Sequence, residues 1–425
     1  MIATQVVMRN SDETFLRFLA LIGRETWKRE IDSIDKSQQQ YPFVGAYRRD
    51  QYQLIHELER YAEIHASNGA VLERDIVARK LDYAVDFMTR TLSLVDMCDS
   101  DSQKNFVARV KGALRDLRAL RGLELEMNTA SHYTNLGYRV RWCELDDYTP
   151  ETSTYDLLVE DTQIGGLEIE CKSFMEDTGQ EIGRESAREV WGALVKAMPQ
   201  VLENLSVGLG VSISVRGHFE SVLKSATQRA MLAKRMLPDL SRVAGAEDIA
   251  STISTEYLDG VTVRIQQFDP LHLADLDLRN RTFGARQRSR RIFGQVTNTT
   301  WLDGTTFFCE PSRRGGGAVI AALRSEEKDQ FVEKVTRTAK EAAKRQLTGQ
   351  RPGLLVLGLP VSSDELAQSS RLRLDAIAKR VFASEGCQHV TGVWFVAQSR
   401  PLSQGFRSRQ MGSTIYRCMR EDFVG

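Results

Sequence analysis

The sequence predicts an α/β fold, in which a mixed-sheet core lies between an N-terminal helical domain and a C-terminal α/β domain. Residues 11–136 carry apolar side chains at helical spacing almost throughout. From residue 138 onward, segments with alternating apolar residues are interspersed with helical patterns. Near the C-terminus, two fully apolar segments are separated by one more helical pattern. This succession is typical of helices packed on a mixed sheet.

The expected helical domain covers residues 1–119. Its clearest helix spans 106–120, with Lys and Arg opposite an apolar face that comprises residues 106, 110, 113, 114, 117 and 120. Gly137 follows the helical region, as a C-cap glycine does. No catalytic motif occurs before residue 100, so we expect a dimerisation or partner-binding module, or a cap on the core.

The expected core covers residues 120–240. Three strands are expected first, at YRVRW (138–142), YDLLVE (155–160) and GGLEIECKSF (165–174). A helix over about 184–204, a strand at 207–215 and a helix over 218–236 are expected to follow. The order helix–strand–strand–strand–helix–strand predicts one compact mixed sheet.

The expected C-terminal domain covers residues 241–425. Strands are expected at 261–268, 293–298, 305–310, 354–360 and 390–398, and helices at about 325–346 and 364–384. The strands at 354–360 and 390–398 are apolar and flank a helix, which is the pattern of a parallel βαβ pair.

Composition restricts the class of protein more than its function. The 425 residues are 42% hydrophobic and 27% charged, with 57 basic and 57 acidic side chains, so the net charge indicates no particular partner. The six cysteines are scattered without a CxxC pair, which argues against structural zinc and disulfides and favours a cytoplasmic location. The apolar run 15–23 is short and contains Arg17, so we expect neither a signal peptide nor a membrane span.

The strand at 166–174 is unusual because Glu168, Glu170 and Lys172 share one of its faces. Charged side chains are rarely buried unless they are paired or bind a metal. Asp156 begins the preceding strand. If the two strands form a meander, Asp156 and Glu170 lie side by side.

Two adjacent carboxylates repel each other, and a divalent cation removes that conflict. Mg²⁺ prefers oxygen ligands and needs only one or two protein carboxylates. It also activates water and neutralises phosphate charge, and Lys172 would orient or deprotonate the water or stabilise the developing charge. The alternative is a solvated sheet face with a Glu–Lys pair, in which Glu168 is a bystander or the partner of Lys172. Glu168 would replace Glu170 as ligand if the strand register slipped by two residues.

Asp156 and the run Glu170–Cys171–Lys172 resemble the signature of the PD-(D/E)XK nuclease superfamily, an Asp on one strand and a Glu-x-Lys on the next. That family often places a Glu on the preceding helix, and the stretch 124–142 matches this pattern with Glu126. The alternative for Glu126 is an exposed helix acid. The resemblance covers roughly residues 120–217.

The resemblance implies a restriction-endonuclease-like fold and a set of roles for these residues. Asp156, Glu170 and the backbone carbonyl of Cys171 would hold Mg²⁺ or Mn²⁺, Glu126 would add a direct or water-mediated ligand, and Lys172 would serve the attacking water. Two departures stand out. No Pro precedes Asp156, and Arg184, Arg188 and Trp191 occupy the following helix, where some branches carry Gln or Tyr.

The implied activity is that of a metal-dependent endonuclease that hydrolyses phosphodiester bonds, with DNA favoured over RNA. The resemblance further implies a homodimer or higher homo-oligomer and a role in antiviral defence or DNA processing. Two alternatives remain open. One is a non-catalytic nucleic-acid-binding protein, and the other is a latent nuclease that a protein partner activates through the helical domain.

A basic segment at 279–294 contains six arginines interleaved with Phe283 and Phe293. Because guanidinium groups suit phosphate oxygens, we expect contacts with nucleic acid from Arg286, Arg288, Arg290 and Arg291. The alternative is a solvated loop, or pairing with the acidic run at 275–277. A second basic stretch, 334–345, is better interpreted as the solvated face of an amphipathic helix.

Overall fold

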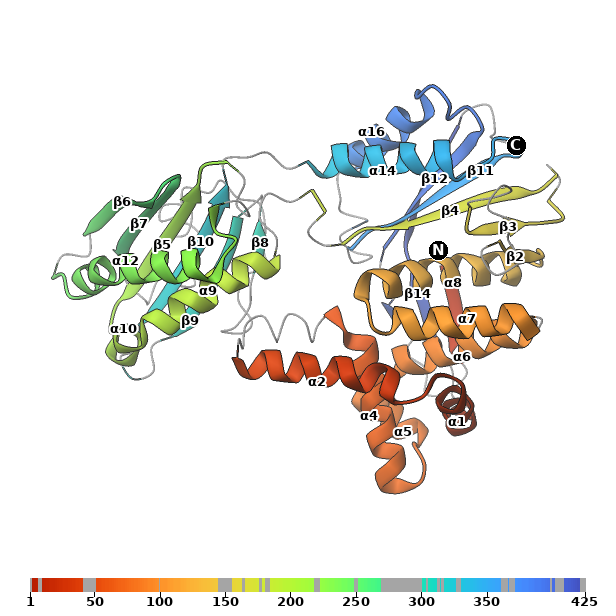
Figure 1. Ribbon diagram of the computed structural model, residues 1–425, viewed down its shortest axis with the longest axis horizontal. Helices are drawn as coiled ribbons and strands as arrows, with labels where there is room; N and C mark the ends of the chain where they lie inside the picture. The colour runs from red at the N-terminus through yellow and green to blue at the C-terminus, as the bar shows by residue number, and fades with distance from the viewer. Residues whose placement is uncertain are drawn as a thin grey trace. The chain divides into compact units, whose positions relative to one another are not determined.

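The computed structural model of the chain describes residues 2–6, 10–40, 51–98, 100–143, 155–162, 165–175, 178–179, 184–217, 222–247, 251–268, 300–302, 305–311, 314, 317–325, 330–360, 366, 371–397, 400–401 and 409–420. Its contacts divide the chain into two compact units (Figure 1). The larger unit comprises Met1–Lys36, Arg48–Thr178 and Phe331–Gly425, and the smaller comprises Gly179–Gln330 with the short segment Ser37–Tyr47. The smaller unit is therefore mainly an insertion into the larger one.

The N-terminal part of the larger unit is helical, as predicted. Its helices are α1 (Ser11–Ile22), α2 (Glu25–Gln40), α4 (Gln53–Asn68), α5 (Glu73–Arg79), α6 (Asp82–Met97), α7 (Ser100–Ala113) and α8 (Leu117–Asn135). Asp116 caps α8 by accepting a hydrogen bond from the backbone N–H of Arg118 at 2.9 Å. Gly137 follows this helix with a φ of 88°, which ends the helix before the first strand of the sheet.

The sheet of the larger unit has six strands in the order β15-β12-β11-β4-β3-β2. The strands are β2 (Val140–Trp142), β3 (Leu157–Val159), β4 (Leu167–Ser173), β11 (Gly353–Gly358), β12 (Val390–Val396) and β15 (Ile415–Met419). The first three form an antiparallel meander. β11 is parallel to both β4 and β12, and β15 is antiparallel to β12. The predicted parallel pair of apolar strands is confirmed.

Helices cover both faces of this sheet (Figure 1). On one face, Ile169 of β4 and Val356 of β11 share a hydrophobic core with Leu123 and Met127 of α8. On the other face, apolar residues of β11 and β12 pack against α14 (Phe331–Arg345) and α16 (Arg371–Phe382). Along the chain, the elements that surround β4 follow the order α8–β2–β3–β4–α14–β11.

A small second sheet in this unit pairs β1 (Ile2–Val6) with β14 (Arg409–Ser413), which in turn pairs with β13 (Arg400–Pro401). None of these three strands was predicted, because strands of two to five residues are too short to give a clear periodic signal.

The smaller unit has its own six-stranded sheet, in the order β6-β7-β5-β10-β9-β8. Its elements are α9 (Arg184–Ala197), α10 (Pro199–Asn204), β5 (Gly208–Val215), α12 (Ala226–Ala244), β6 (Thr252–Leu258), β7 (Val261–Phe268), β8 (Thr300–Leu302), β9 (Thr305–Pro311) and β10 (Ala318–Ser325). The single helix predicted at 184–204 is two helices, because Pro199 occupies the first turn of α10 and lacks an N–H for a longer helix. The strand predicted at 293–298 lies outside the described residues.

The expected domains 1–119, 120–240 and 241–425 do not coincide with the two units. The helices before residue 119 share one hydrophobic core with the sheet, since Phe18 and Phe87 belong to the same cluster as Ile169. β5 pairs with β7 and β10 and not with β4, whereas β11 lies directly beside β4. Periodicity identifies a strand but not its partner, so the insertion was not visible in the sequence.

The α/β class is confirmed, and no helix in the described parts of the chain is long and apolar enough to cross a membrane.

Candidate active site

Asp156 and Glu170 are neighbours at the start of β3. In the antiparallel ladder, Leu157 lies opposite Ile169 and Leu158 lies opposite Glu168, so the same register places Asp156 opposite Glu170. The Oδ2 atom of Asp156 accepts a hydrogen bond from the backbone N–H of Cys171 at 2.7 Å. Both carboxylates are buried. The meander that the sequence predicted therefore brings the two acidic residues together.

Lys172 is bound to Glu170. Its ammonium group donates a hydrogen bond to the Oε1 atom of Glu170 and forms an ion pair with it. Burial alone would lower the pKa of Lys172, but the negative charges of Glu170 and Asp156 outweigh burial and raise this pKa above its ordinary value. Lys172 therefore carries its proton at neutral pH and acts as a cation at this position.

Glu126 is buried on α8 and bound to an arginine. Its side chain accepts a hydrogen bond of 2.7 Å from a terminal guanidinium nitrogen of Arg109, which lies on α7. The interpretation of Glu126 as an exposed helix acid is wrong, because only 6% of its side chain is accessible. One turn later on α8, the hydroxyl of Thr129 lies 3.9 Å from the sulfur of Cys171. Glu126 thus lies on the α8 side of the sheet, which is the side toward which the Cys171 side chain points.

The three carboxylates act together on the thiol of Cys171. Burial raises the pKa of this thiol well above its ordinary value, and the charges of Asp156, Glu126 and Glu170 raise it further. The thiol is therefore protonated and chemically inert. The negative potential here comes from two strands and one helix, which meet at the Glu170–Cys171–Lys172 run.

The donor set fits a hard divalent cation. Within the described residues, no three acidic, histidine or cysteine side chains are arranged to hold a metal ion by themselves. Mg²⁺ and Mn²⁺ do not need such a group, because water and substrate oxygens complete their coordination. Asp156, Glu170 and the carbonyl oxygen of Cys171 offer oxygen ligands, and the protonated thiol offers none to a thiophilic metal. The Oδ2 atom of Asp156 already accepts one backbone hydrogen bond, which fixes the orientation of this carboxylate.

Glu168 belongs to a different arrangement. It is fully buried and accepts hydrogen bonds from the backbone N–H of Thr348 at 2.8 Å and from its hydroxyl at 2.5 Å. Arg351 lies 3.8 Å from the same carboxylate. Glu168 therefore fastens the segment between α14 and β11 and is not the partner of Lys172. The register slip that would make Glu168 a ligand does not occur, and the face is not a solvated one.

The remaining predicted residues lie elsewhere. Arg184, Arg188 and Trp191 belong to α9 of the smaller unit, where Trp191 is part of the core. The helix that follows the Glu-x-Lys strand within the larger unit is α14. This helix buries Val335, Ala339 and Ala342, and it exposes Arg337, Lys344 and Arg345, as expected for a solvated amphipathic face.

Arg286, Arg288, Arg290 and Arg291 lie outside the described residues.

Sequence reasoning missed Arg109. A weak signal was present, because Arg109 borders the apolar stripe of α7 between Phe106 and Val110. An arginine in that position can bury its stem and direct its guanidinium group toward a neighbouring helix.

Comparison of the chain with protein-family models, with curated proteins and with solved structures gave no significant match. The site therefore has to be interpreted from its own geometry.

Proposed function

We propose that the protein is a metal-dependent nuclease that hydrolyses phosphodiester bonds, with DNA as the favoured substrate. The observation that carries this proposal is the placement of buried Asp156 and Glu170 and partly buried Lys172 beside one another on two adjacent strands. Buried charges gathered in this way are costly unless they serve binding or catalysis. The proposal also draws on the resemblance to PD-(D/E)XK nucleases.

The order of elements supports the same proposal. The succession α8–β2–β3–β4–α14–β11 supplies a helix, a three-stranded meander, a second helix and a strand parallel to β4. We propose that this is a restriction-endonuclease-like core, interrupted by residues 179–330 directly after the Glu-x-Lys strand. The backbone N–H of Gln330 donates a hydrogen bond of 2.9 Å to the carbonyl of Gly179, so the two ends of the insertion lie together and the core is not interrupted in space.

In this proposal the residues of the chain have distinct roles. Asp156, Glu170 and the carbonyl oxygen of Cys171 would hold Mg²⁺ or Mn²⁺, which supplies an activated water and neutralises phosphate charge when bound. The hydrogen bond from the Cys171 N–H keeps the Asp156 carboxylate in one orientation. Lys172 is protonated because its pKa is raised, so it stabilises negative charge on the phosphate rather than removing a proton from water. Glu126 adds negative charge from α8.

The direct test is cleavage of plasmid DNA, single-stranded DNA and RNA by the full-length protein with Mg²⁺, with Mn²⁺ and with EDTA. Asp156→Asn should reduce cutting to background, and Lys172→Ala should reduce its rate on the order of a hundredfold or more. Glu168→Gln is the matched control, because Glu168 is equally buried on the same strand but binds Thr348. This variant should cut at close to the wild-type rate.

Two results would contradict the proposal. Metal-dependent cutting that survives both Asp156→Asn and Lys172→Ala would place the chemistry elsewhere. Absence of cutting by the folded wild-type protein on every substrate and metal would favour a non-catalytic nucleic-acid-binding protein or a latent enzyme. Addition of cell extract would separate those two, because only a latent enzyme gains activity that depends on Asp156.

A further inference from the structure

Arg109 forms a half-buried ion pair with the carboxylate of Glu126. The N–O distance is 2.7 Å, and 27% of the Arg109 side chain and 6% of the Glu126 side chain are accessible. A buried carboxylate without a positive partner is strongly destabilising, because it has lost its hydration. Arg109 therefore contributes to the stability of the protein when no metal is bound.

The charge of Arg109 has a second consequence because Glu126 belongs to a larger negative cluster. Glu126 lies one turn before Thr129 on α8, and the hydroxyl of Thr129 is 3.9 Å from the sulfur of Cys171. The backbone carbonyl of Cys171 is one of the oxygen ligands proposed for the cation. A positive charge on Arg109 thus lowers the negative potential that attracts a divalent cation.

We propose that Arg109 is the built-in counter-ion of the metal site: it holds the Glu126 carboxylate in place in the metal-free protein and weakens the binding of divalent cations. This inference rests on the metal site of the proposed function. Arg109 is a positioning residue, since it acts through Glu126. Two effects of opposite sign follow from the loss of its charge. The metal-free protein becomes less stable, and its affinity for Mn²⁺ increases.

The test uses the full-length protein, with Mn²⁺ as the probe. Arg109→Gln removes the charge, and Arg109→Lys retains it. Affinity is measured by electron paramagnetic resonance of free Mn²⁺ at constant ionic strength, and thermal unfolding is recorded in EDTA and in saturating Mn²⁺. Arg109→Gln should bind Mn²⁺ on the order of tenfold more tightly, because the loss of the positive charge paired with Glu126 favours a divalent cation. It should unfold at a lower temperature in EDTA and recover in Mn²⁺, and Arg109→Lys should resemble the wild type.

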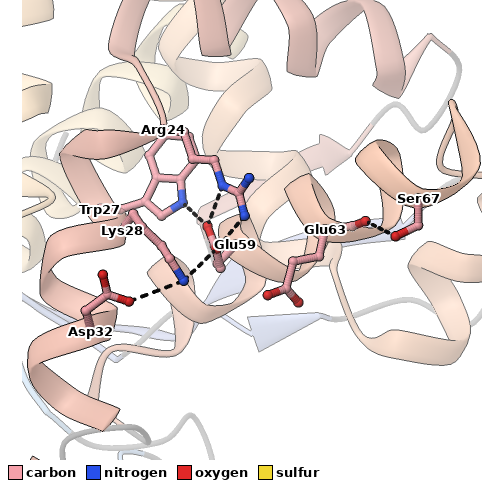
Figure 2. A network of polar contacts seen from close by, with 7 residues as sticks. All are labelled: Arg24, Trp27, Lys28, Asp32, Glu59, Glu63 and Ser67. Atoms are coloured by element: carbon pink, nitrogen blue, oxygen red, sulfur yellow. Dashed lines mark hydrogen bonds and ion pairs between the residues drawn. The ribbon is translucent and has the colours of Figure 1, made fainter. Parts of the chain in front are cut away.

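The matched control is Arg24→Gln. Arg24 forms an ion pair of the same length, 2.7 Å, with the buried Glu59, with 39% and 6% of the two side chains accessible. Figure 2 shows this pair within its own network, which connects Arg24 and α2 to α4. Arg24→Gln should lower the unfolding temperature equally in EDTA and in Mn²⁺ and leave the Mn²⁺ affinity unchanged.

If Arg109→Gln does not fold, the double variant Arg109→Gln/Glu126→Gln replaces it, because it removes both charges together. Its unfolding temperature should differ less between EDTA and Mn²⁺ than that of the wild type.

The outcomes separate this inference from the proposed function. Equal or weaker Mn²⁺ binding by Arg109→Gln, with normal binding by the wild type, overturns the role of Arg109 and leaves the metal site intact. Absence of Mn²⁺ binding by every variant overturns the metal site and this inference with it.

Discussion

Two regions of the larger unit bury carboxylates in opposite ways. On α4, Glu59 accepts hydrogen bonds from Arg24 at 2.7 and 3.1 Å and from the indole N–H of Trp27 at 3.1 Å, and Lys28 lies 3.2 Å away (Figure 2). One negative charge is thus surrounded by two positive charges and a neutral donor. At β4, three carboxylates gather around Cys171, and the positive partners in the described ion pairs are Arg109 and Lys172.

The pKa values follow these arrangements. Burial tends to raise the pKa of Glu59, but Arg24 and Lys28 outweigh it and lower this pKa below its ordinary value. At β4, burial and the nearby carboxylates raise the pKa of the Cys171 thiol, and the carboxylates raise the pKa of Lys172 against the effect of burial. Glu59 with its two cations fastens two helices, whereas the carboxylates gathered at β4 are the basis of the proposed cation site.

Substitution of Glu59 should reduce the stability of the protein. Glu59→Gln should lower the free energy of unfolding at pH 7 by roughly 1–2 kcal/mol, because charge-assisted hydrogen bonds are lost while Arg24 and Lys28 remain partly solvated. The contribution of Glu59 is complete above the ordinary glutamate pKa of 4.5 and is lost as the pH falls through its lower folded-state pKa.

Urea unfolding between pH 3 and pH 7 checks this expectation. The wild type should lose stability more steeply than Glu59→Gln below about pH 4.5, so that the two curves converge. Parallel curves over the whole range would show that Glu59 is not held by its cations.

Glu124 affects the stability of the protein with the opposite pH dependence. Burial raises its pKa to about 7, although the hydroxyl of Tyr83 and the charges of Arg90 and Arg121 act against this shift. The unfolded chain therefore releases this proton at a lower pH than the folded protein, and wild-type stability falls as the pH rises from about 4.5 to 7.

Glu124→Gln removes this loss, since its amide oxygen still accepts a hydrogen bond from Tyr83. Relative to the wild type, the variant should gain roughly 2–3 kcal/mol between pH 5 and pH 8. Urea unfolding of both proteins at pH 5 and pH 8 tests this expectation. If the variant and the wild type differ in stability by the same amount at both pH values, the raised pKa of Glu124 is contradicted.

The sequence correctly predicted that Asp156 and Glu170 lie side by side, because this arrangement depends on two strands that are neighbours in the chain. Alternation along residues 166–174 and the position of Asp156 were sufficient to predict the meander, because antiparallel neighbours in the chain pair with each other. The burial of Glu126 was less predictable. It depends on α7, which supplies Arg109, and no local pattern shows which helices pack together.

The inserted unit was not predicted, for a different reason. β5 and β11 both follow a helix and both are apolar, so each satisfies the pattern expected after the Glu-x-Lys strand. Only the pairing of Leu355 with Glu170 shows that β11 is the neighbour of β4. A contact between residues so far apart in the chain leaves no trace in periodicity.

The most direct measurement compares Mn²⁺ binding by three full-length proteins: the wild type, Glu170→Gln and Glu59→Gln. The last variant is the control, because it also removes one buried carboxylate of the same unit. Wild type and Glu59→Gln should bind Mn²⁺ with equal affinity, and Glu170→Gln should bind it on the order of tenfold more weakly or not at all. Equal binding by Glu170→Gln and the wild type would contradict the central claim that the cluster at β4 is a divalent-cation site.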